Sequence, residues 1–185
     1  MGPTAPAGGT DDGLAPAHLF SLAGRTALVT GGSLGIGAMV AEGFVAAGAR
    51  VLVAARTAAD LDATAARIGA EPIVADLATA DGCAALAGAV ASRAEHLDVV
   101  VHSAGATGIA PVDQADEDGW DRILAINLRA VHRLTAGLLP LLTARATADQ
   151  PSRVIVVGST SGDLVSGMPD AAYGASKAAV HHLVR

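Results

Sequence analysis

The chain has 185 residues, enough for one domain with a substantial core, and 51% of them are hydrophobic while only 2% are aromatic. The net charge of −6 gives no electrostatic footprint for nucleic acid or for an anionic membrane surface. No apolar run reaches the roughly 18 residues of a membrane span, and we see no secretory signal pattern. The single cysteine, Cys83, cannot form an internal disulfide and is expected as a small buried side chain on a helix. Together these features predict a cytoplasmic protein.

The predicted elements alternate along the chain after an initial tail. Residues 1–18 are rich in Gly, Pro, Ala and Thr without apolar periodicity, which predicts a disordered tail. Short apolar runs predict strands at Thr26–Thr30, Arg50–Ala54, Pro72–Ala75, Asp98–His102 and Arg153–Gly158. Segments with helical period predict helices at Ile36–Ala47, Ala58–Ile68, Ala80–Ala94, Trp120–Ala144 and Ala171–Arg185. The alternation indicates an α/β fold with a doubly wound parallel sheet, whose ligand site is expected at the C-terminal ends of the strands.

A glycine-rich turn, T-G-G-S-L-G-I-G at residues 30–37, joins the first predicted strand to the first helix. Gly31 and Gly35 permit tight turning and close backbone approach, and Gly37 lets the helix pack on the strand. The N-terminus of the helix would present free N–H groups to a pyrophosphate. A surface turn can also collect glycine, but this position in the first βαβ unit favours nucleotide binding.

The only tyrosine and the only lysine of the chain, Tyr173 and Lys177, stand four residues apart. On a helix, residues i and i+4 share one face, so the ammonium can lie beside the phenol. A neighbouring positive charge favours the ionised form of a phenol. This spacing therefore predicts an acid–base pair that can donate or accept a proton near neutral pH.

The spelling T-G-x-x-x-G-I-G at 30–37 with Y-x-x-x-K at 173–177 resembles the short-chain dehydrogenase/reductases, from about Leu22 to the last residue. Within that family the chain is most similar to β-ketoacyl (3-oxoacyl-ACP) reductases of the kind associated with rhamnolipid synthesis. The stretches that carry this likeness are L-A-G-R at 22–25, L-L-P-L-L at 138–142 and Y-G-A-S-K at 173–177. The resemblance implies a Rossmann-type, three-layer α/β/α domain over residues 19–185 that binds NAD(P).

The resemblance also implies a set of cofactor contacts around the glycine turn and the strand ends. They are Gly31, Ser33, Leu34, Gly35, Ile36, Arg56, Asp76, Leu77, Ser103, Ala104, Gly105, Tyr173 and Lys177.

Cofactor preference is expected to depend on Arg56, after the second strand, since a cation there favours a ribose 2′-phosphate. NADP(H) is thus favoured over NAD(H), although Arg56 could also merely solvate a strand end. Asp76 matches the family position that contacts the adenine, and it could equally be a helix N-cap.

Residues 102–105, H-S-A-G, stand where the family usually has N-N-A-G. His102 and Ser103 depart from the usual asparagines, and we interpret His102 as a satisfied structural residue.

The catalytic residues implied by the resemblance are Asn127, Ser159, Tyr173 and Lys177. Ser159 and Tyr173 would hydrogen-bond a substrate carbonyl, Tyr173 would act as general acid during hydride transfer, and Lys177 would bind the nicotinamide ribose. Thr160 and Ser161 are alternatives to Ser159. Asn127 is expected to hold a water that relays protons to Lys177, although a local backbone kink is another reason for an Asn in this helix.

No metal site is expected. The acidic residues between 113 and 121 are interpreted as a solvated helix start, and no Cys/His spacing suggests zinc. The adjacent His181 and His182 are predicted to lie on or near a subunit interface.

Relatives continue beyond residue 185 with further strands and a substrate lid, so we expect a domain that is incomplete on its C-terminal side. The predicted function is NADPH-dependent reduction of a ketone, such as a 3-oxoacyl thioester, by a homodimer or homotetramer in the full-length form. The alternatives are a non-catalytic nucleotide-binding module and an inactive fragment of such an enzyme.

Overall fold

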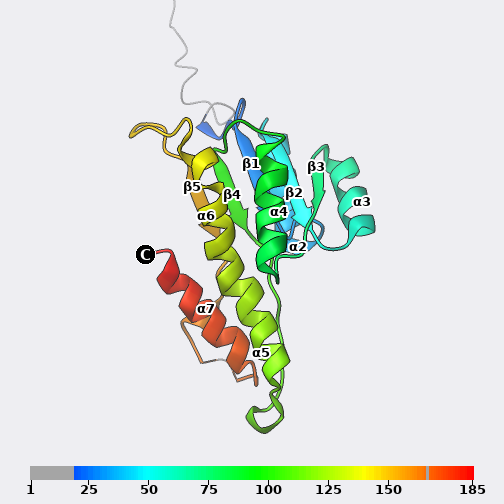
Figure 1. Ribbon diagram of the computed structural model, residues 1–185, viewed down its shortest axis with the longest axis vertical. Coiled ribbons are helices and arrows are strands. Elements are labelled where there is room, and N and C mark those ends of the chain that lie inside the picture. The colour runs from blue at the N-terminus through cyan, green and yellow to red at the C-terminus, as the bar shows by residue number, and fades with distance from the viewer. Residues whose placement is uncertain (1–18, 166) are drawn as a thin grey trace, which may run out of the picture.

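Five parallel strands form one sheet in the order β3-β2-β1-β4-β5 in the computed structural model (Figure 1). The structure describes residues 19–165 and 167–185, so the predicted tail over 1–18 lies outside the described residues. The strands are β1 (Thr26–Thr30), β2 (Arg50–Ala55), β3 (Glu71–Val74), β4 (Val99–His102) and β5 (Arg153–Val156). The order reverses between β1 and β4, which is where a doubly wound sheet opens a crevice for a ligand.

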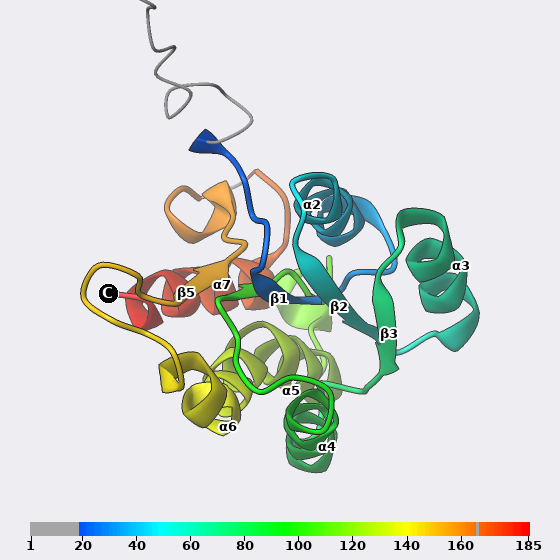
Figure 2. The ribbon, with the colours of Figure 1, turned by 90° about the horizontal axis from the view of Figure 1, so that it is seen from above.

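Helices cover both faces of this sheet. The α-helices are α2 (Gly35–Ala46), α3 (Ala58–Ile68), α4 (Ala80–Ala91), α5 (Glu117–Leu124), α6 (Ala130–Thr143) and α7 (Ala171–Leu183). Shorter turns are η2 (Val112–Gln114), η3 (Ala125–Arg129) and η4 (Thr160–Gly162). Seen along the strands, α2 and α3 lie on one face and α4, α5 and α6 on the other (Figure 2). The predicted three-layer α/β/α fold is therefore confirmed.

The core consists of two aliphatic clusters, one on each face of the sheet. Leu28 is in register with Leu52 and Val100, and these three side chains pack with Leu86 of α4 and Leu134 of α6. The opposite cluster takes the alternate strand positions, Ala27, Val29, Val51, Val53, Val99 and Val101. Because a strand points successive side chains to opposite faces, both faces require apolar residues, which explains the continuous apolar runs of the sequence.

The long helix predicted over Trp120–Ala144 is wrong in its start and in its continuity. α5 begins at Glu117 because the Asp116 carboxylate accepts a hydrogen bond from the N–H of Gly119 at 2.5 Å and caps the helix. Glu117 and Asp118 occupy its first turn, so this part of the acidic cluster is a helix start, as expected. A π-helical turn, η3, then separates α5 from α6.

At the N-terminal edge of the sheet, the carboxylate of Asp98 fastens β1 to β4. It accepts hydrogen bonds from the N–H of Thr26 and the guanidinium of Arg25, both at 2.8 Å, and lies 3.3 Å from His96 Nε2. Partial burial by itself would raise the pKa of Asp98, but the bonds from Thr26 and Arg25 outweigh it and lower that pKa. This edge is thus closed by polar bonds, and the opposite edge is left for a site.

His102 ends β4 with its ring buried, and its Nε2 lies 2.9 Å from Thr135 Oγ1 of α6. The interpretation of His102 as a satisfied structural residue is confirmed by this contact. Burial disfavours the charged imidazolium and lowers the pKa of His102 to about 4.

This shift predicts that the folded state loses stability at pH values well above those at which carboxylates are usually protonated. The unfolded chain binds a proton on His102 near pH 6.5, whereas the folded chain binds it near pH 4. The contribution of neutral His102 to the free energy of unfolding is therefore full above pH 6.5 and decreases as the pH falls from 6.5 to about 4. Urea denaturation should show a loss of about 2 kcal/mol between about pH 7.5 and pH 5. His102→Gln should remove this loss, and His182→Gln, at an exposed position on α7, should retain it. Equal pH dependence in wild type and His102→Gln would contradict the assignment.

Candidate active site

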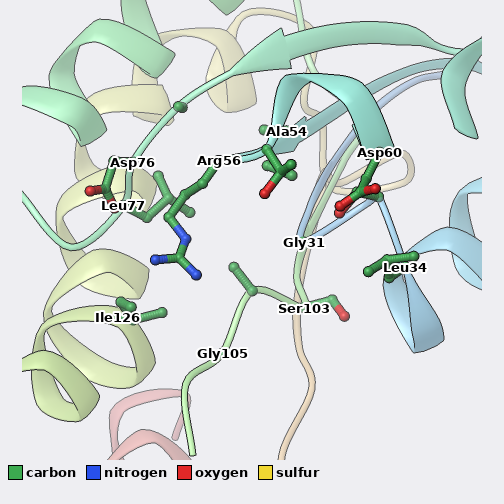
Figure 3. Close-up of a pocket in the computed structure, with 15 residues that line it drawn as sticks. Gly31, Leu34, Ala54, Arg56, Asp60, Asp76, Leu77, Ser103, Gly105 and Ile126 are labelled. Carbon is green, nitrogen blue, oxygen red and sulfur yellow. The ribbon is translucent and has the colours of Figure 1, made fainter. Parts of the chain in front are cut away.

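A cavity of about 360 Å³ opens at the C-terminal edge of the sheet, over the crevice between β1 and β4 (Figure 3). Nine of the thirteen predicted cofactor residues line it: Gly31, Ser33, Leu34, Arg56, Asp76, Leu77, Ser103, Ala104 and Gly105. Segments from four strand ends therefore meet in one place, as expected for parallel strands.

Gly31 forms the floor of the cavity because the turn after β1 touches the loop after β4. Its φ of 67° is in the left-handed region, and a Cβ built there would lie 2.8 Å from the Cα of Ala104. Thr30 strengthens this contact, since its Oγ1 accepts hydrogen bonds from the N–H groups of Ser103 and Ala104, both at 3.2 Å. The absence of a side chain at Gly31 is therefore what lets the two loops touch at the floor of the cavity.

The N-terminus of α2 borders the same cavity through Ser33 and Leu34. Leu34 is the N-cap residue but makes no side-chain capping bond, and the first turn carries no acidic residue. The helix can approach the strand closely because Gly37 has no side chain; a Cβ there would overlap the carbonyl of Gly31. The uncapped N–H groups and the positive end of the helix dipole suit an anionic group such as a pyrophosphate.

Arg56 extends its guanidinium into the cavity from the end of β2, and the Asp76 carboxylate lies at the far rim (Figure 3). The alternative that Asp76 is an N-cap is wrong, because Thr79 caps α4 by accepting a hydrogen bond from the N–H of Gly82 at 2.9 Å. Asp76 instead accepts a bond from the N–H of Ala78 at 3.1 Å and shapes the loop.

The remaining predicted cofactor residues do not line this cavity. Gly35 and Ile36 continue the turn into α2, and Tyr173 and Lys177 lie on α7. Six lining residues were missed by sequence reasoning: Ala54, Ala55, Thr57, Asp60, Ala75 and Ile126. Four of them lie at or just after the C-terminal ends of strands, where a ligand site is expected. Asp60 and Ile126 lie on helices, and no sequence signal distinguished them.

Tyr173 and Lys177 occupy one face of α7, as their spacing predicts. The Lys177 ammonium lies 5.7 Å from the centroid of the Tyr173 ring. It donates a hydrogen bond to the carbonyl of Val157, just after β5, at 2.7 Å. Lys177 is buried, and burial lowers the pKa of its ammonium.

Ser159 lies in the loop between β5 and η4, against the same helix. Its Oγ accepts a hydrogen bond from the N–H of Ser161 at 3.2 Å, so the hydroxyl hydrogen remains able to donate elsewhere. η4 packs on α7, and a Cβ built on Gly162 would lie 2.8 Å from the backbone carbon of Lys177. The loop that carries Ser159 and the helix that carries Tyr173 are therefore in direct contact.

Asn127 is buried in the π-helical turn and joins the cavity to α7. Its amide nitrogen donates to the carbonyl of Ala106 and to Ser176 Oγ, each at 2.9 Å, and its Oδ1 accepts from the N–H of Ala106 at 2.8 Å. A π turn often marks a functional site, and here it brings the amide inward. The local backbone irregularity considered for this Asn is present, whereas its part in a proton relay stays a prediction.

Two negative findings concern the described ranges, 19–165 and 167–185. They contain no group of three or more His, Cys, Asp or Glu side chains that could hold a metal ion. Within them no helix is both long and apolar enough to cross a membrane.

Comparison with solved structures finds the same fold. The Pseudomonas aeruginosa RhlG/NADP active-site complex matches with a TM-score of 0.86 at 43% identity, over 89% of this chain and 66% of that one. A putative NAD(P)-dependent gluconate 5-dehydrogenase from Beutenbergia cavernae, with bound NADP at low occupancy, matches with a TM-score of 0.81 at 37% identity, over 90% and 66% of the two chains.

Curated sequences also resemble this chain over most of its length. The chain is 44% identical over 170 residues to a rhamnolipids biosynthesis 3-oxoacyl-[acyl-carrier-protein] reductase of Pseudomonas aeruginosa, covering 90% of this chain and 66% of the relative. It is 33% identical over 171 residues to a galactitol 2-dehydrogenase (L-tagatose-forming) of Cereibacter sphaeroides, covering 90% and 65%. The chain thus spans about two thirds of the length of these relatives. The family model for short chain dehydrogenases matches residues 25–185, which include both the glycine turn and the Tyr173–Lys177 pair, and the chain belongs to that family.

Proposed function

We propose that this chain belongs to an oxidoreductase that uses NADP(H) to reduce a ketone, specifically a 3-oxoacyl thioester, to the alcohol. The observation that carries the proposal is the Lys177 ammonium 5.7 Å from the Tyr173 ring, on a helix packed against the Ser159 loop. The 44% identity to a 3-oxoacyl-[acyl-carrier-protein] reductase supports the substrate class.

The residues that line the cavity support the proposal of a dinucleotide with a phosphorylated ribose. Gly31 and Ala104 line the cavity floor over which the cofactor would cross, and the uncapped end of α2 suits the pyrophosphate. Arg56 supplies the cation for a 2′-phosphate, while Asp76 is a candidate hydrogen-bond acceptor for the adenine amino group. The bound cofactor would supply the hydride, and side chains of this chain would orient the carbonyl and supply the proton.

Reduction of the carbonyl requires a proton on the oxygen as a new C–H bond forms. Ser159 and Tyr173 would hydrogen-bond that oxygen, and Tyr173 would transfer its phenolic proton to it. The Lys177 ammonium next to the ring would offset the negative charge left on the phenolic oxygen, until a proton from solvent restores the phenol. Asn127 would hold the loop and helix in register and support this proton return.

Replacement of Tyr173 by Phe removes the proton donor but retains the ring beside Lys177. We expect kcat with a 3-oxoacyl thioester and NADPH to fall about 100- to 10,000-fold. The dissociation constant for NADPH should change by less than about threefold, because the ring and the ammonium persist. Steady-state NADPH oxidation and isothermal titration measure the two quantities.

Turnover that survives in Tyr173→Phe would contradict the assignment of Tyr173 as general acid. Saturable NADPH binding without any turnover in the wild type would instead support the non-catalytic nucleotide-binding module.

The choice of Ser159 over Ser161 can be tested with a matched pair of variants. Ser159→Ala removes the hydroxyl and should lower kcat about 10- to 1,000-fold. Ser161→Ala retains the backbone N–H that holds Ser159 Oγ, so its kcat should stay within about threefold of wild type. The reverse order of effects would transfer the role to Ser161.

Cofactor preference should depend on the charge of Arg56. Arg56→Ala should weaken NADPH binding about 10- to 100-fold and leave NADH binding nearly unchanged, because only NADPH carries the 2′-phosphate. Arg67→Ala is the control, since Arg67 is exposed on α3 and pairs with Glu42 outside the cavity. Equal losses for both cofactors in Arg56→Ala would show that Arg56 acts on the fold and not on the phosphate.

A further inference from the structure

His181 lies one turn after Lys177 on α7 and reaches back to the Ser159 loop. Its Nε2 is 3.3 Å from the backbone nitrogen of Ser159, and its Nδ1 is 3.2 Å from Asp163 Oδ1, just after η4. The imidazole side chain is 21% exposed, whereas the Asp163 side chain is 67% exposed. One ring therefore joins the catalytic helix to both ends of the segment that carries Ser159.

The loop is shaped to receive this ring. A Cβ built on Gly158 would lie 2.5 Å from His181 Nε2, and a Cβ built on Gly162 would lie 2.8 Å from its Cε1. Any other residue at either position would push the imidazole away. The glycines before and after the Ser-Thr-Ser segment thus make the space in which the imidazole sits.

The two contacts assign the protonation state of the ring. The backbone N–H of Ser159 is a donor, so His181 Nε2 must present a lone pair to it. The carboxylate of Asp163 is an acceptor, so Nδ1 must carry the hydrogen. In the neutral imidazole the hydrogen is therefore on Nδ1, where it is donated to Asp163, and Nε2 is the acceptor.

We propose that His181 is a positioning residue, which orients the Ser159 hydroxyl relative to Tyr173 by accepting the hydrogen bond of the Ser159 backbone N–H. This proposal rests on the catalytic role proposed above for Ser159. Ser159 is held from two sides, since its backbone N–H donates to His181 Nε2 and its Oγ accepts from the N–H of Ser161. Because His181 and Tyr173 share one helix, the contact sets both hydrogen-bond donors to the substrate oxygen from one rigid element.

The tautomer and the backbone contact can be tested on the 185-residue chain without any substrate. Long-range proton–nitrogen NMR should place the His181 hydrogen on Nδ1, and Asp163→Ala should shift the population toward Nε2. Amide hydrogen exchange at Ser159 should accelerate about tenfold in His181→Leu, which fills the space without an acceptor. His181→Gln, whose side-chain oxygen can accept the same bond, should restore protection.

The role in catalysis needs a split between turnover and binding. His181→Leu should lower kcat about tenfold while KM for NADPH stays within about twofold, and His181→Gln should recover most of the loss. His182→Leu, at the exposed neighbouring position, is the control and should behave as wild type.

Each failure has a separate meaning. A hydrogen on Nε2, unchanged exchange at Ser159 in His181→Leu, or equal kcat losses in the Leu and Gln variants would overturn the positioning role. If wild type neither binds NADPH nor turns over a carbonyl substrate, the proposed function fails. The tautomer and exchange measurements then still decide whether His181 holds the Ser159 backbone.

Discussion

The close contact between the turn after β1 and the loop after β4 is the constraint on which the rest of the site depends. Gly31 approaches Ala104 so closely that no side chain fits between them, and Thr30 bonds two N–H groups of the β4 loop. The contact has two consequences. It joins the two central strands at the point where their helices depart to opposite faces, and it forms the floor of the cavity at the switch point of the sheet.

A second junction connects this floor to the groups that could perform chemistry. Asn127 bonds both backbone groups of Ala106 and also Ser176, so the loop after Gly105 and the helix of Tyr173 are held together. Burying an amide is costly unless its hydrogen bonds are made, and here three are. The π-helical turn interrupts the regular α-helix at the position where Asn127 faces inward.

Polar contacts close the sheet at the N-terminal ends of its strands and leave the C-terminal ends open to the cavity. At the N-terminal ends of the strands, Asp98 neutralises Arg25 and ties β1 to β4. At the C-terminal ends, Arg56 and Asp76 extend around the cavity without bonding each other. The buried ammonium of Lys177 donates a hydrogen bond to the carbonyl of Val157, which stabilises the ammonium in its position beside Tyr173. At the side of the sheet, the edge strand β5 exposes Val154 and Ile155 by 42% and 45%.

Sequence alone determined the alternation of strands and helices, the glycine turn and the Tyr173–Lys177 pair, because each depends on neighbours at most a few residues away. It could not determine that Thr79 and not Asp76 caps α4, or that α5 begins three residues before Trp120, since an N-cap is chosen by which backbone N–H a side chain can reach. It also could not assign Asp60 and Ile126 to the cavity or His181 to the Ser159 loop. Ile126 lies 21 positions after Gly105, and His181 lies 22 positions after Ser159. Such contacts exist only once the parallel strands have brought their C-terminal ends together.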